Sequence, residues 1–324
     1  MFKKTLSIIL AAALIVVSGC NNNNPPANTT TESVAAPADA WEYEMYIEDL
    51  DYYMELCIQN YDAMQYALSV QDPYEAEKNI DYIFENINSI ENIIYPSNLE
   101  ESHAEFLAAL SLHKELIECY HELIGYMKKS DSLTQEDYDE LDKINAKGEG
   151  IEARISEEGN INDACFKAKE AAFLNLPNGE YKFYAHTLQI FWGRYTGQIN
   201  YLYEVFINGA EEDVIGLCDD ALGTLSRIEN MKIPESVKPY HDEIIKLLPT
   251  ERELCQTAKT LQELYTKYQI TNDISSLENV PADVQEQANK CYDIINGYLE
   301  LNSEYHITDD AVFTAIEFAE SQAN

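Results

Sequence analysis

Two histidines, His103 and His241, are the residues best suited by type and position to bind a ligand or transfer a proton. Each lies on an apolar stripe with helical spacing: Leu99, His103, Phe106 and Leu110 form the first, and Val237, His241, Ile244 and Leu248 form the second. We therefore expect both imidazoles to face the interior of a helical bundle. A neutral histidine hydrogen-bonded across the core, for example to Asn92 or Asn230, fits such a position. Ligand or metal contact and acid–base catalysis are the alternatives.

The other chemical patterns in the sequence are incomplete. His121 and Glu122 begin the zinc-protease pattern His-Glu-x-x-His, but Gly125 stands where the second histidine is required. Glu105 and Glu243 each follow a candidate histidine by two positions, which is about 200° around a helix, so neither shares a face with that histidine. We therefore predict no catalytic residues, no metal site and no cofactor.

The first twenty residues are arranged like an export signal that ends in a lipid attachment site. A basic start with Lys3 and Lys4 precedes an apolar run over residues 6–17, which is too short to span a bilayer comfortably. The sequence Val17-Ser18-Gly19-Cys20 follows. It resembles the lipobox of bacterial lipoproteins. The resemblance implies that residues 1–19 are a signal peptide and that Cys20 becomes the N-terminus and carries lipid such as palmitate. It also implies anchoring at the outer face of the cytoplasmic membrane.

Residues 20–40 are predicted to be the lipidated cysteine and a flexible linker. The segment contains Asn and Pro runs followed by Thr, Ser and Ala, and it has no apolar periodicity. Such a composition offers too little apolar surface to offset the entropy lost on ordering. A linker of this length reaches about 25 Å, which is enough to lift the folded part away from the membrane.

The charge of the chain excludes one class of partner. The sequence has 21 Lys and Arg residues against 58 Asp and Glu residues, which gives a net charge of −37. Such a chain repels DNA, RNA and anionic lipid, so we predict no nucleic-acid binding and attachment to the membrane through the N-terminal lipid alone. We expect a neutral or cationic small molecule, peptide or protein as partner. The acidic, Asn- and Tyr-rich, Arg-poor composition favours a Gram-positive cell surface.

From Trp41 onward the chain shows helical periodicity. Residues three or four positions apart form two long apolar faces: Tyr43, Tyr46, Leu50, Tyr53, Cys57, Tyr61, Met64 and Leu68, and then Tyr184, Leu188, Phe191, Tyr195, Ile199, Leu202 and Phe206. This pattern predicts an all-α fold of helical bundles. Asp72-Pro73 is predicted to end one long helix, and Pro96 and Pro234 to end later ones. The glycine-rich region 148–162 is predicted to be either a loop or an interrupted helix.

The chain repeats part of its own sequence at an offset of 138 residues. Residues 89–123 and 227–261 align without a gap, and ten of these 35 positions are identical, His103 and His241 among them. About two identities are expected by chance. We therefore predict two tandemly duplicated helical units, 41–176 and 177–324.

Six cysteines besides Cys20 are spread too widely for a metal or redox cluster, since no two lie closer than 36 residues. We expect most of them to be buried thiols without disulfide bonds. Tyr52, Tyr66, Tyr74 and Tyr82 fall off the apolar faces. Exposed tyrosines there are expected either to mark a contact surface or to cover the flanks of helices.

These observations favour a membrane-anchored extracytoplasmic helical lipoprotein that acts as a non-enzymatic binding or interaction module. One alternative is an extracytoplasmic hydrolase or metal-dependent enzyme that uses His103 and His241 with carboxylates from other helices. The other is a sensory or scaffold subunit of a membrane complex.

Overall fold

The computed structural model describes residues 39–129, 132–158, 160–208, 214–268, 280–304 and 307–323. Within these ranges the chain is helical and has no β-strand, so the predicted all-α class is confirmed. Contacts divide the chain into two compact units, the first ending at Pro177 and the second beginning at Asn178. The predicted signal peptide, Cys20 and most of the predicted linker lie outside the described residues.

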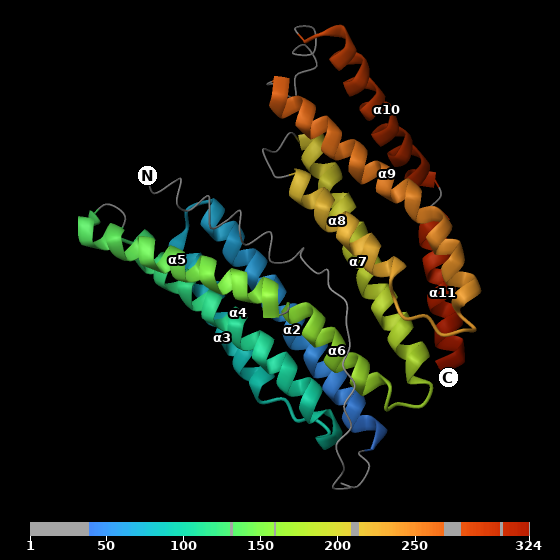
Figure 1. Cartoon of the computed structure of the whole chain (residues 1–324), viewed down its shortest axis with the longest axis horizontal. Coiled ribbons are helices and arrows are strands. Elements are labelled where there is room, and N and C mark those ends of the chain that lie inside the picture. The colour runs from blue at the N-terminus through green and yellow to red at the C-terminus, as the bar shows by residue number, and fades with distance from the viewer. Residues whose placement is uncertain are drawn as a thin grey trace. The chain divides into compact units, whose positions relative to one another are not determined.

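The first unit is a helical bundle in which α4 contacts three other helices (Figure 1). Its elements are α2 (Ala40–Ser69), α3 (Pro73–Glu91), the short 3₁₀ helix η1 (Ser97–Leu99), α4 (Glu100–Met127), α5 (Gln135–Glu158) and α6 (Ile161–Phe173). The helix α2 packs against α3 and α6, while α4 packs against α3, α5 and α6. This arrangement places the apolar faces of the helices against one another and leaves the acidic faces in solvent.

The second unit has its helices in contact in the same order along the chain (Figure 1). Its elements are α7 (Gly179–Asn208), α8 (Val214–Glu229), α9 (Lys238–Tyr268), α10 (Ala282–Glu304) and α11 (Ile307–Ala323). Here α7 packs against α8 and α11, and α9 packs against α8, α10 and α11. The duplication itself stays a prediction, because helical bundles adopt a small number of layouts whatever their ancestry.

The predicted apolar faces lie in the core except at three positions of α2, where Tyr53, Cys57 and Tyr61 are half-buried. In α2, Tyr43, Tyr46 and Leu50 are buried, as are all of the predicted positions of α7 whose side chains are described. Met54, next to Tyr53, is buried in its place. A helix turns once every 3.6 residues, so the buried face moves to the four-residue step between Leu50 and Met54.

Two helix boundaries follow from side chains that bind free backbone N–H groups. The Asp72 carboxylate accepts hydrogen bonds from the backbone N–H groups of Tyr74 and Glu75, both at 3.1 Å, and Pro73 opens α3. In the region predicted as a loop or an interrupted helix, α5 continues through Gly148 and Gly150 and ends at Glu158. The Asn160 side chain then accepts a hydrogen bond from the N–H of Asn162 at 2.8 Å to begin α6.

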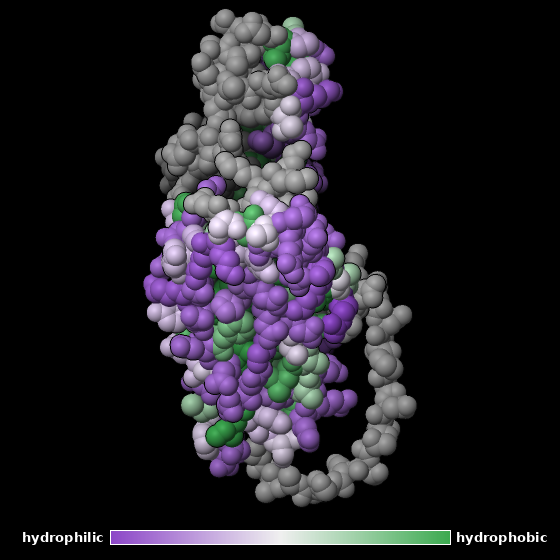
Figure 2. All heavy atoms as spheres, turned by 90° about the vertical axis from the view of Figure 1, so that its left-hand side faces the viewer, coloured by the Kyte–Doolittle hydropathy of each residue, from purple (hydrophilic) through white to green (hydrophobic). Residues whose placement is uncertain are grey.

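The surface is hydrophilic over the face shown in Figure 2, and its hydrophobic residues lie there in small separate groups. Tyr52, Tyr66, Tyr74 and Tyr82 are all exposed, as expected from their position off the apolar faces. The six cysteines that the structure describes are free thiols, and all but Cys57 are buried. Among the described helices none is long and apolar enough to cross a membrane.

Candidate functional site

His103 and His241 are each buried beside a buried tyrosine. Both histidines are only 1% exposed. The hydroxyl of Tyr46 lies 3.0 Å from Nδ1 of His103, and the hydroxyl of Tyr184 lies 2.9 Å from Nδ1 of His241. Burial raises the pKa of both tyrosines and lowers the pKa of both histidines. Both side chains therefore stay neutral, and we assign the proton of each hydrogen bond to the tyrosine hydroxyl, with Nδ1 as the acceptor.

Asn92 and Asn230 are not the partners of these histidines, so this part of the prediction is wrong. Both asparagines are exposed, and each lies directly after the last residue of its helix, α3 or α8. The Asn92 amide donates to the backbone carbonyl of Asn88, and the Asn230 amide donates to that of Ser226, both at 2.7 Å. At a helix end the unpaired carbonyls of the last turn are the nearest acceptors, so these amides bind them instead of reaching the core.

The surroundings of the two histidines favour a structural role over a chemical one. The ring of Tyr95 stacks on His103 with centroids 4.1 Å apart. Among the described residues, the backbone of Ile228 lies within hydrogen-bond reach of the His241 ring and opposes the lowering of its pKa by burial. Across the same part of the chain, no group of three His, Cys, Asp or Glu side chains is arranged to hold a metal ion. A neutral imidazole between aromatic rings, with a tyrosine as its hydrogen-bond donor, contributes packing and a buried hydrogen bond.

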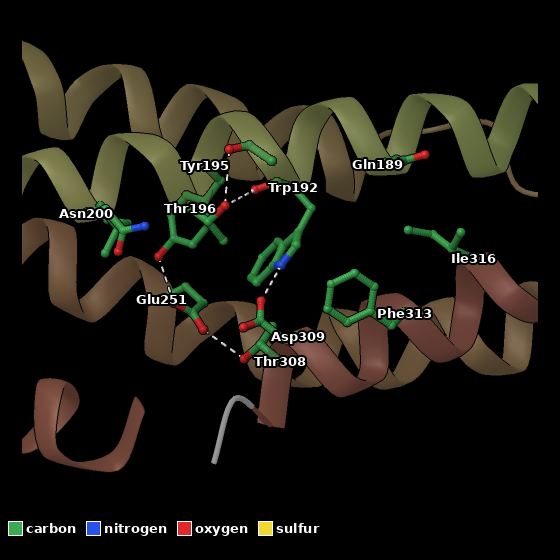
Figure 3. A pocket seen from close by; sticks show the side chains of 12 residues that line it. Gln189, Trp192, Tyr195, Thr196, Asn200, Glu251, Thr308, Asp309, Phe313 and Ile316 are labelled. Carbon is green, nitrogen blue, oxygen red and sulfur yellow. Dashed lines mark hydrogen bonds between the residues drawn. The ribbon is translucent and has the colours of Figure 1, made fainter. Parts of the chain in front are cut away.

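A pocket of about 320 Å³ opens between α7, α9 and α11 of the second unit (Figure 3). Its lining combines aromatic and aliphatic side chains with polar ones: Gln189, Trp192, Gly193, Tyr195, Thr196, Ile199, Asn200, Glu251, Thr308, Asp309, Phe313 and Ile316. Figure 3 shows Trp192 on α7 and Phe313 on α11 extending into the space between the two helices. Apolar walls with a few placed polar groups are typical of small-molecule sites, and this volume is at the lower end of their range.

Two carboxylates in the pocket are held by neutral donors. The Glu251 side chain is buried, with 3% of the residue exposed. One of its oxygens accepts a hydrogen bond from the Tyr195 hydroxyl at 2.6 Å and the other from the Thr308 hydroxyl at 2.7 Å. The indole N–H of Trp192 donates to Asp309 Oδ1 at 2.5 Å. These hydrogen bonds hold both carboxylates in fixed positions at the pocket wall.

The pocket was not predicted from the sequence, although one of its residues carried a signal. Glu251 lies three positions after Leu248 and four before Cys255, so a charged residue interrupts an apolar face of α9. At the offset of 138 residues, the first unit has Met54, Cys57 and His113 where the second has Trp192, Tyr195 and Glu251. The side chains that give the pocket its chemistry are therefore particular to the second unit.

The chain was compared with known proteins in three ways. No protein-family model, curated protein or solved structure matches this chain.

Proposed function

We propose that this protein is a lipid-anchored binding module at the outer face of a bacterial cytoplasmic membrane, and that its second unit captures a small neutral or cationic molecule without converting it. The observation that carries the proposal is the pocket between α7, α9 and α11, where Glu251 and Asp309 are held in place beside Trp192 and Phe313.

The anchor rests on the lipobox-like sequence and on the charge of the chain. Val17-Ser18-Gly19-Cys20 provides the acylated residue, and a chain of net charge −37 has no electrostatic attraction to anionic lipid. Cys20→Ser should abolish incorporation of labelled palmitate and release the protein from the membrane fraction. Cys57→Ser, which changes a half-buried thiol on α2, is the matched control and should label like the wild type. Palmitate labelling of the Cys20→Ser protein would refute the anchor.

Binding can be followed with the protein's own fluorescence, because the chain has two tryptophans and only Trp192 lines the pocket. Trp41 is 60% exposed at the start of α2, so Trp41→Phe should leave the fold intact and make Trp192 the sole reporter. We expect a saturable change in emission with at least one member of a panel of sugars, amino acids and amines. The Trp192→Phe protein, which keeps Trp41, should show none. A flat response to the whole panel, repeated by calorimetry, would contradict the proposal.

The two alternatives have weaker support. A hydrolase or metal-dependent enzyme using His103 and His241 would need carboxylates beside them, whereas Nδ1 of each histidine is bonded to a tyrosine hydroxyl. A sensory or scaffold subunit would present a continuous apolar patch, and the face in Figure 2 has only small separate groups.

A further inference from the structure

We propose that the pocket between α7, α9 and α11 binds a short neutral sugar chain, a proposal that rests on the binding function above and specifies its ligand. The juxtaposition of the exposed Phe313 ring with the side-chain amides of Gln189 and Asn200 in one pocket points to this class (Figure 3). Three features of the pocket support it: its length, the amides at its rim and the accessible aromatic ring.

The pocket is elongated, because it follows one face of each of two helices (Figure 3). On α7 the lining residues at steps of four, three and four positions share a face: Gln189, Gly193, Thr196 and Asn200. This face extends for about 16 Å along the helix axis. On α11 the steps are four and three: Asp309, Phe313 and Ile316. An extended ligand of two or three linked rings therefore fits the pocket better than a single compact one.

The amides at the rim are suited to hydroxyl groups. Gln189 and Asn200 are exposed and lie at the two ends of the α7 face. Each amide has a carbonyl acceptor and two N–H donors, so it can both donate to and accept from a sugar hydroxyl. Glu251 and Asp309 are already hydrogen-bonded to side chains of the protein, so we assign recognition to the neutral amides. The net charge of −37 disfavours an acidic sugar.

The ring of Phe313 provides the accessible aromatic surface. It is 56% exposed although it lines the pocket, and it extends toward α7 (Figure 3). A sugar ring carries hydroxyls at its edge and C–H groups on its faces, so one face can cover an aromatic ring while the edge binds amides. This contact removes apolar surface of both rings from water. Trp192 and Ile316 are buried beside it and form the floor of the pocket.

Gly193 keeps the middle of the pocket open. It lies on the α7 face between the two amides, and a Cβ at this position would meet no atom within 4 Å. A larger side chain there would therefore occupy space that the ligand needs. Gly197 is exposed on the same helix and has the same free space around its Cβ, but it does not line the pocket. The two glycines provide a matched pair of positions.

The first test compares sugar chains with single sugars and with a peptide. The full chain carrying Trp41→Phe is titrated with maltotriose, cellotriose and N-acetylchitotriose, with their monosaccharides, and with the blocked neutral peptide acetyl-trialanine-amide. We expect a saturable change in Trp192 emission with at least one trisaccharide, and binding at least about tenfold tighter than that of its monosaccharide. Binding of the peptide or an amine but of no sugar, or equal affinities for trisaccharide and monosaccharide, would overturn the sugar proposal and leave the binding function standing. No response to any ligand would overturn both.

The second test places the sugar in the pocket. Gly193→Leu should weaken trisaccharide binding at least about tenfold in calorimetry, because its side chain takes the place of the ligand. Gly197→Leu gains the same helix propensity and should bind like the parent. Equal affinities in these two variants would overturn the proposal.

The third test concerns the aromatic ring. Phe313→Tyr keeps the ring and should retain trisaccharide binding, whereas Phe313→Leu keeps an apolar side chain without the flat face and should bind more weakly. The melting temperature of each variant shows that the unit is folded. Equal binding by the Tyr and Leu variants would show that no sugar lies on this ring and would overturn the proposal.

Discussion

In the core of each unit, a buried histidine is hydrogen-bonded to a buried tyrosine. A tyrosine supplies a large apolar ring together with one donor, whereas a carboxylate in the same place would bring a charge into a dry interior. Tyr46 and Tyr184 are fully buried. Each hydroxyl is hydrogen-bonded to the Nδ1 atom of the neighbouring histidine, which in a neutral imidazole can accept through its unprotonated nitrogen. The hydrogen bond therefore fixes the rotamer of both partners and joins two helices.

Replacing Tyr46 by Phe should lower the free energy of unfolding by about 1–3 kcal/mol, because Nδ1 of His103 loses its donor where water does not reach it. The measurement is urea unfolding of the full chain, followed by circular dichroism. Tyr66→Phe is the control, since Tyr66 is 71% exposed, and it should change the free energy by less than about 0.5 kcal/mol. An unfolding free energy equal to the wild type in Tyr46→Phe would show that this hydrogen bond does not stabilise the fold.

At the scale of the helices, the ends are set by particular side chains and the buried faces by helical pitch. Asp72 caps α3 at its first turn, and Asn160 separates α5 from α6. The glycines within α5 do not break it, because Leu141, Ile144, Ile151 and Ile155 remain buried on one face. Burial of that face outweighs the loss of about 1 kcal/mol expected for each glycine in a helix.

Asp72→Ala should destabilise the protein by about 0.5–2 kcal/mol, because the N–H groups of Tyr74 and Glu75 lose their acceptor at the start of α3. Thermal unfolding of the full chain measures the effect. Asp72→Asn retains a side-chain oxygen and should recover most of the stability. If the Ala and Asn variants were equally destabilised, the loss would come from the charge near the helix N-terminus rather than from the cap.

For the whole molecule the dominant quantity is its negative charge. The chain carries 58 acidic side chains against 21 basic ones, and most of the described ion pairs are at the surface, where each contributes little. The pair between Lys169 and Asp51 differs from these, since the lysine is buried and its Nζ lies 2.6 Å from the carboxylate. Repulsion among the remaining acids favours expansion of the folded state.

Raising the NaCl concentration from about 0.05 to 0.5 M should increase the melting temperature of the protein, because the screening length falls to a few ångströms and repulsion among the acids weakens. Differential scanning calorimetry measures the change. A variant with Glu136→Gln, Asp142→Asn and Glu149→Gln, all at exposed positions of α5, should respond less steeply to salt. A melting temperature that stays constant or falls with salt would contradict this account.

The sequence determined the features that depend on local spacing. Helical periodicity predicted the all-α class, the buried faces of α2 and α7, and the inward direction of His103 and His241. Asp72-Pro73 indicated where one helix ends and the next begins. These features follow from the geometry of one helix and from which residues are apolar, so neighbouring residues are sufficient to predict them.

Only the tertiary structure decided which side chains meet. Tyr46 and His103 lie 57 positions apart, and their pairing depends on how α2 and α4 are turned against each other. Trp192, Glu251 and Asp309 come from three helices, and no spacing within one helix brings them together. The rotation of each helix about its axis is set by packing with all of its neighbours at once. Periodicity places a residue on a face but does not choose the residue opposite it.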